Sequence, residues 1–227
     1  MKQKIALLWD IDGTLLTTSG IGRGPLLDAI QSSTGHEGDY DLVASSGLTD
    51  HQIVNQILEP LGLAGNNLDE LIKQILEDYC ARYAELLLIK KLKILNKVDE
   101  FLQALHLQEN ILNLICTGNY IKGAKIKLSN VGLDKYFPDQ NYFCSQSLEN
   151  RSEIVARAKG MATDNGYEPI VIGDTIHDIE ASKINGIKCI ALESESYSFD
   201  LLKAASPQAL LRLGWDLPHL ENAIYAS

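Results

Sequence analysis

The sequence predicts an α/β protein with a parallel sheet, helices on both faces of that sheet, and a small α-helical insertion after the first strand. Three observations support this class. Short apolar runs alternate with helical patterns, polar motifs directly follow several of those runs, and one connection is far longer than the others. Parallel strands joined by right-handed βαβ crossovers produce this alternation.

The first expected strand is a short, continuous apolar run, as is typical of strands buried on both faces, and similar short runs recur along the chain. They span residues 5–9, 111–116, 142–144, 169–172 and 187–192, with a last edge strand at 209–211. Helical patterns lie between them at residues 119–131, 151–164 and 175–185, and a closing helix is expected at 216–225. In such a sheet a ligand binds beyond the carboxyl ends of the strands.

The connection after the first strand is the exception to this rhythm. Asp12 and Thr117 follow two expected strands, yet they lie much further apart than the roughly 30 residues that a βαβ unit needs. Three helical patterns fill the surplus, at residues 24–33, 50–58 and 68–88. We therefore expect an α/β core of residues 1–16 and 93–227, and a helical domain of residues 17–92 that is hinged near both ends and acts as a lid.

The bulk composition narrows the possible partners. A formal net charge of −10 argues against nucleic acid, and no apolar run approaches the roughly 20 residues of a membrane span. The four cysteines include no CxxC pair, and the first apolar run is too short for a signal peptide. We expect a cytoplasmic protein, a monomer or a homodimer, that binds neither nucleic acid nor membrane.

The first polar motif is Asp-Ile-Asp-Gly-Thr-Leu at residues 10–15, directly after the first strand. In an extended segment, residues two apart project to the same side, so Asp10 and Asp12 reach one pocket. Two carboxylates at close range repel each other, and a cation between them relieves the repulsion. The motif therefore indicates a cation site rather than a solvated turn.

The second polar motif is Gly-Asp-Thr-Ile-His-Asp at residues 173–178. Asp174 is expected where a helix begins, and Asp178 lies one turn further along the same face. The two carboxylates can offer oxygen atoms to the same hard cation. Both acidic motifs end strands of one sheet, which predicts a shared site.

Two further segments suggest a place for an anion. Thr117, Gly118 and Asn119 end another strand and open a helix, where a hydroxyl and free backbone N–H groups form an anion cradle. Asn-x-x-Glu at residues 150–153 indicates a capping box, which puts Arg151 at a helix N-terminus near the ligand edge. Lys159 is the other basic candidate, but it lies roughly 12 Å further along that helix.

Taken in order, these segments resemble the four motifs of the haloacid dehalogenase-like hydrolase superfamily, whose core is Rossmann-like. The helical insertion resembles the first-type cap domain of the phosphoglycolate phosphatase-like branch. Gly47-Leu48-Thr49-Asp50 resembles a segment often seen in such caps. Arg151 departs from the family pattern, where a Lys followed by Pro is common.

The resemblance implies a Mg²⁺-dependent phosphatase that acts on a small phosphorylated metabolite. Asp10 would be the nucleophile and form an aspartyl-phosphate, and Asp12 would be the general acid and base. The metal would be bound by Asp10, the carbonyl of Asp12 and Asp174, with support from Asp178. The phosphate would be held by Thr117, Gly118, Asn119 and Arg151, and Arg23 and Thr49 would contribute to substrate specificity.

Two alternatives stay open at this point. One is a phosphosugar mutase of the same fold, which would return the phosphoryl group to its substrate. The other is a non-catalytic phosphate-responsive binding protein. Asp12 disfavours haloacid substrates, because dehalogenating members of the superfamily typically lack an acid at that place.

Overall fold

The computed structural model describes residues 3–43, 47–63, 67–95 and 97–226. Its main sheet has six strands in the order β5-β4-β1-β6-β7-β8, and all neighbouring pairs are parallel. The predicted fold class is therefore confirmed. The strands are β1 (Ile5–Trp9), β4 (Ile111–Tyr120), β5 (Tyr142–Ser145), β6 (Glu168–Gly173), β7 (Lys188–Leu192) and β8 (Ala209–Leu211).

The central strand β1 is the first apolar run of the sequence, and all five of its residues are buried. It lies between β4 and β6, so two of the motif-bearing strands flank it directly. The order of connection reverses at this point, because the chain goes from β1 to β4 on one side and later returns to β6 on the other. Such a reversal opens a crevice at the carboxyl ends of the strands.

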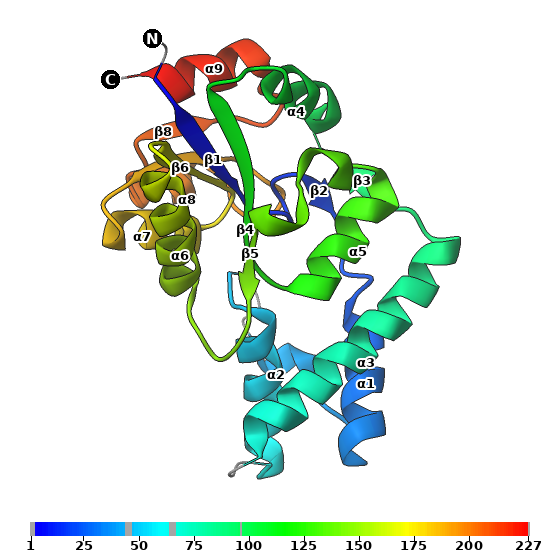
Figure 1. Ribbon diagram of the computed structural model, residues 1–227. Helices are drawn as coiled ribbons and strands as arrows, with labels where there is room; N and C mark the ends of the chain where they lie inside the picture. Colours follow the sequence, from blue (N-terminus) through cyan, green and yellow to red (C-terminus); the bar gives the residue numbers. More distant parts are fainter. Residues whose placement is uncertain (1–2, 44–46, 64–66, 96, 227) are drawn as a thin grey trace.

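Helices cover both faces of the sheet (Figure 1). One face packs against α6 (Arg151–Asp164), α7 (Ile176–Ile184) and α8 (Phe199–Ala204). The other packs against α4 (Val98–His106), α5 (Ile121–Val131) and α9 (Leu217–Tyr225). Two 3-10 turns, η3 (Asp134–Tyr136) and η4 (Asp139–Asn141), connect α5 to β5.

A small antiparallel ribbon stands at the base of the long insertion. It consists of β2 (Leu16–Thr17) and β3 (Lys93–Ile94), in which Thr17 is paired with Lys93. Between these strands lie α1 (Arg23–Thr34), η1 (Tyr40–Leu42), α2 (Asp50–Leu58), η2 (Glu59–Leu61) and α3 (Leu68–Ile89). In Figure 1 these helices lie beyond the carboxyl ends of the strands, at the end of the molecule opposite the two termini.

Most elements agree with those expected from the sequence, but the end of β4 differs. The predicted helix at 119–131 begins only at Ile121, because β4 continues in extended conformation through Tyr120. Its pairing with β5 shifts register between Cys116 and Tyr120. Residues 117–119 therefore lie in an irregular strand end rather than at a helix N-terminus.

None of the helices in these four described segments is both long and apolar enough to cross a membrane.

Candidate active site

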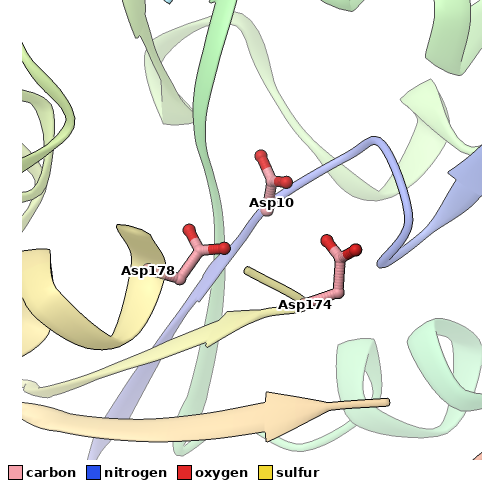
Figure 2. Close-up of side chains that lie close together, drawn as sticks. All are labelled: Asp10, Asp174 and Asp178. Atoms are coloured by element: carbon pink, nitrogen blue, oxygen red, sulfur yellow. The ribbon is translucent and has the colours of Figure 1, made fainter. Parts of the chain in front are cut away.

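Three buried carboxylates meet at the carboxyl ends of β1 and β6. Asp10 follows β1, and its backbone N–H donates to the carbonyl of Ile172 in β6 over 2.9 Å. Asp174 follows β6, and Asp178 is in the first turn of α7. One carboxylate oxygen from each aspartate lies within 4.8 Å of the others, and Figure 2 shows the three side chains around a common space.

The turn between β6 and α7 fixes the position of Asp178. Thr175 is the N-cap of α7 and forms a capping box with Asp178. The carboxylate oxygen Oδ2 of Asp178 accepts the backbone N–H of Thr175 over 3.1 Å and its hydroxyl over 2.7 Å. Asp174 precedes the helix instead of opening it, so the two aspartates approach the site from different segments.

Gly13 allows the first motif to pass close to the second. Its φ is +84°, and a Cβ atom at this position would lie 2.2 Å from an oxygen of Asp174. Only glycine accepts this combination of a left-handed conformation and a close approach. The hydroxyl of Thr14 donates to Oδ1 of Asp174 over 3.3 Å.

Arg151 is the basic residue that the fold brings to the carboxylates. The predicted capping box of Asn150 and Glu153 is present at the start of α6. The Arg151 guanidinium lies 2.8 Å from Asp10 Oδ1, and its Nε donates to Asp178 Oδ1 over 3.0 Å. Lys159, the other candidate, donates to a backbone carbonyl at the end of α7 over 2.6 Å.

The charge of this centre is unbalanced. Burial raises the pKa of Asp10, although the guanidinium of Arg151 opposes that effect. Burial and the neighbouring carboxylates raise the pKa of Asp174 well above its ordinary value. For Arg151, burial favours the neutral form, but the carboxylates of Asp10 and Asp178 outweigh it and raise its pKa further.

Three carboxylates with one guanidinium leave an excess of negative charge in a buried place. Clustered carboxylate oxygens are the ligands that hard divalent cations prefer. The donor set of Asp10, Asp174 and Asp178 therefore fits a metal ion.

The carboxylate of Asp12 makes different contacts. Its Oδ2 lies 2.6 Å from Nζ of Lys127 and accepts Nδ2 of Asn119 over 2.8 Å. Asn119 also donates to the hydroxyl of Thr117 over 2.8 Å. The side chain of Asn119, a predicted phosphate ligand, is thus bonded to Asp12 and Thr117.

Lys127 was not expected from the sequence. It is buried on α5, on the face that also carries Gly123, Ala124 and Leu128. Burial alone would lower the pKa of Lys127, but the charges of Asp12 and Asp50 raise it above the ordinary value. A lysine among small and apolar residues on one helical face was the available signal.

A cavity of about 600 Å³ opens above these residues toward the insertion. Its lining includes Asp10, Thr117 and Arg151 from the core and Arg23, Tyr79 and Tyr83 from the insertion. Arg23 also pairs with Asp41 over 2.7 Å and lies over the ring of Tyr40.

Thr49, the other predicted specificity residue, is fully buried beside the cavity. Its side chain caps α2 in a capping box with Gln52 and donates to the carbonyl of Glu149 over 3.3 Å. Its neighbours Leu48 and Asp50 line the cavity.

The insertion is docked onto the core beside the site. A carboxylate oxygen of Asp50 accepts the backbone N–H of Tyr120 over 2.7 Å. Nδ1 of His51 lies 2.6 Å from the hydroxyl of Ser145. A Cβ atom on Gly118 would lie 2.8 Å from the carbonyl oxygen of Leu48, so the two backbones are in close contact.

The fold and the acidic centre together define an α/β enzyme core with a carboxylate at the end of its central strand. Comparison with known proteins agrees: the model of the family "Haloacid dehalogenase-like hydrolase" matches residues 7–192. The chain belongs to this family of hydrolases.

Several proteins that are similar to the chain have names of hydrolases or phosphatases. It is 23% identical to a protein of Caldanaerobacter subterraneus subsp. tengcongensis named "Putative pyrophosphatase PpaX", over 93% of this chain and 92% of that protein. The crystal structure of a hydrolase from Pseudomonas syringae is similar with a TM-score of 0.71 and 21% identity, over 99% of this chain and 100% of that one. A "predicted phosphoglycolate phosphatase" from Haemophilus somnus 129pt has a TM-score of 0.68 and 17% identity, over 97% and 99% of the two chains.

Proposed function

We propose that this protein is a Mg²⁺-dependent phosphatase that hydrolyses a small phosphorylated metabolite through an aspartyl-phosphate at Asp10. The observation that carries the proposal is the position of Asp10. It is buried at the end of the central strand, bonded to Arg151, and grouped with Asp174 and Asp178 at the foot of the cavity. A cavity of about 600 Å³ is in the range of small-molecule sites.

In the first step, an oxygen of Asp10 attacks phosphorus and the bond between phosphorus and the ester oxygen breaks. Asp12, as the carboxylic acid, gives its proton to the departing oxygen. In the second step, Asp12 takes a proton from water as the water oxygen attacks phosphorus, and inorganic phosphate leaves Asp10. Two steps with a covalent intermediate replace one more difficult displacement.

The residues around Asp10 make this attack feasible. Arg151, held between Asp10 and Asp178, can donate its remaining N–H groups to phosphoryl oxygens. The hydroxyl of Thr117 and the backbone of Gly118 line the same cavity. When bound by Asp10, Asp174, Asp178 and the Asp12 carbonyl, Mg²⁺ would offset the repulsion between the nucleophile and the phosphate dianion.

The insertion of residues 17–92 would act as the cap domain and select the substrate. Arg23 supports this view, because it lines the cavity from the insertion side. Thr49 would contribute by holding the start of α2 in place, with Leu48 and Asp50 at the cavity wall. The cytoplasmic location that we propose is supported by four cysteines that are all buried thiols.

The test is the release of inorganic phosphate from p-nitrophenyl phosphate and from a panel of phosphosugars, phosphoglycolate and nucleotides. We expect turnover that requires Mg²⁺ and is abolished by Asp10→Asn. The control Asp139→Asn changes an aspartate whose side chain is 87% exposed, and it should leave turnover unchanged. Stoichiometric phosphate release would exclude a mutase, whereas binding without any turnover would contradict the proposal.

A further inference from the structure

Lys127 is a buried lysine that the proposed reaction does not use. Its side chain is 8% exposed and comes from α5, which contributes no other residue to the chemistry. Transfer of an ammonium group out of water is unfavourable by several kcal/mol unless neighbouring groups replace its hydration. The groups that Nζ contacts are therefore those that replace its hydration and stabilise its charge.

Nζ of Lys127 contacts two side-chain oxygens, one of Asp12 and one of Asn119. It lies 2.6 Å from Asp12 Oδ2 and donates to Oδ1 of Asn119. The amide of Asn119 donates in turn to the same Oδ2 atom over 2.8 Å. The lysine and the asparagine thus hold each other while both bind one carboxylate oxygen.

These contacts fix the direction of the Asp12 carboxylate. The rotation of a carboxylate about its last side-chain bond is broad unless hydrogen bonds select an orientation. Oδ2 has two donors, and Oδ1 is buried without a hydrogen-bond partner among the described residues. Lys127 and Asn119 are therefore the side chains that orient Asp12.

We infer that Lys127, supported by Asn119, is a positioning residue that orients Asp12 for proton transfer to the leaving oxygen of the substrate. This inference rests on the proposed function, because it has a consequence only if Asp12 exchanges a proton with the substrate. Lys127 also lines the cavity, but its Nζ is bonded to Asp12 and Asn119, so its effect on the reaction passes through Asp12.

The inference has a signature that a purely structural role lacks. A leaving group that departs readily as an anion needs little protonation, whereas a poor leaving group depends on the general acid. Misorientation of Asp12 should therefore harm poor leaving groups most. A disturbed fold, or weaker binding of phosphate, would lower the rates of all substrates by a similar factor.

The experiment uses the full chain with saturating Mg²⁺ and a series of substituted phenyl phosphates. We compare kcat/KM, which covers only the steps up to departure of the leaving group and leaves out the second step, in which Asp12 acts on water for every substrate. For Lys127→Met we expect kcat/KM for phenyl phosphate to fall about 100-fold, the lower end of general-acid contributions. For 2,4-dinitrophenyl phosphate the fall should be less than about tenfold, since that leaving group needs little help. The control Lys125→Met alters an exposed lysine of the same helix, paired with Asp139, and should change neither rate.

Asn119→Ala removes the second donor to Asp12 and should show the same dependence of the rate loss on the leaving group, with a smaller amplitude. If Lys127→Met does not fold, Asn119→Ala tests the inference in its place. An equal loss for all leaving groups, or no loss, would overturn the inference but not the proposed function. A wild-type protein without Mg²⁺-dependent hydrolysis would instead overturn the proposed function, and this inference with it.

Discussion

Arg151 is the side chain whose loss should unbalance the acidic centre most. Its guanidinium is 10% exposed and binds Asp10 and Asp178 at once, so Arg151→Met leaves buried carboxylates without their counter-charge. Removal of one partner from a buried ion pair costs about 3–5 kcal/mol. We expect a loss of this size in the free energy of unfolding, measured by urea titration in EDTA. Arg151→Lys keeps the charge but cannot span both carboxylates, so its free energy of unfolding should lie between those of the wild type and Arg151→Met.

The matched control is Arg82→Met, which breaks a pair with Asp78 on the surface of α3. That pair is 38% and 32% exposed and should contribute no more than about 1 kcal/mol. Saturating Mg²⁺ should restore part of the stability of Arg151→Met, since a ligand at 100 times its Kd adds about 2.7 kcal/mol. The description of the acidic centre is wrong if Arg151→Met, like Arg82→Met, lowers the free energy of unfolding by less than about 1 kcal/mol. It is also wrong if Mg²⁺ stabilises neither of these two variants.

Three further predictions concern pH and packing. Burial raises the pKa of Asp10 and of Asp174. The stability that these groups contribute below about pH 4 is therefore lost as the pH rises through their raised pKa values. Urea titrations in EDTA should show this decline with pH, and Asp174→Asn should make it smaller. Burial lowers the pKa of His51 from 6.5, so the stability that His51 contributes above pH 6.5 is lost as the pH falls below it. Tm should therefore fall less steeply with decreasing pH in His51→Gln than in the wild type. An unchanged dependence of Tm on pH would contradict this. Gly118→Ala would place a Cβ 2.8 Å from a backbone oxygen of the insertion and should cost about 1–3 kcal/mol. Gly160→Ala, in open space within α6, should instead add up to about 1 kcal/mol; equal effects on Tm would refute the close packing.

The sheet could be predicted because its strands are buried on both faces. β1 is a continuous apolar run, and β7 is apolar after Lys188, so the positions of both strands follow from hydropathy. The end of β4 could not, because Thr117, Gly118 and Asn119 are polar and carry no strand pattern. The strands β2 and β3 have two residues each, too few to show a period.

Helix α4 was missed although its signal is present. Its buried residues are Val98, Phe101, Leu102 and Leu105, which is the spacing of one helical face. The short helix α8 has one buried residue, Leu202, and offers no comparable pattern.

The acidic centre followed from local patterns, whereas its partners depend on tertiary structure. Asp10, Asp174 and Asp178 each stand at a strand end or a helix start, and these positions are visible in the sequence. The helical face of α5 signals that Lys127 is buried, but its contact with Asp12 joins residues 115 apart, and nothing local indicates that partner. Similarly, the docking of Asp50 against Tyr120 depends on how the insertion folds back onto the core.

The measurement that tests the central claim most directly is the detection of a phosphorylated Asp10. The wild-type protein would be mixed with a radiolabelled aryl phosphate and Mg²⁺, quenched in acid, and digested. We predict a hydroxylamine-labile label on the peptide that contains Asp10, and no label in Asp10→Asn. A wild-type enzyme that releases phosphate without labelling that peptide, or an Asp10→Asn variant that keeps its turnover, would contradict the assignment of Asp10 as the nucleophile.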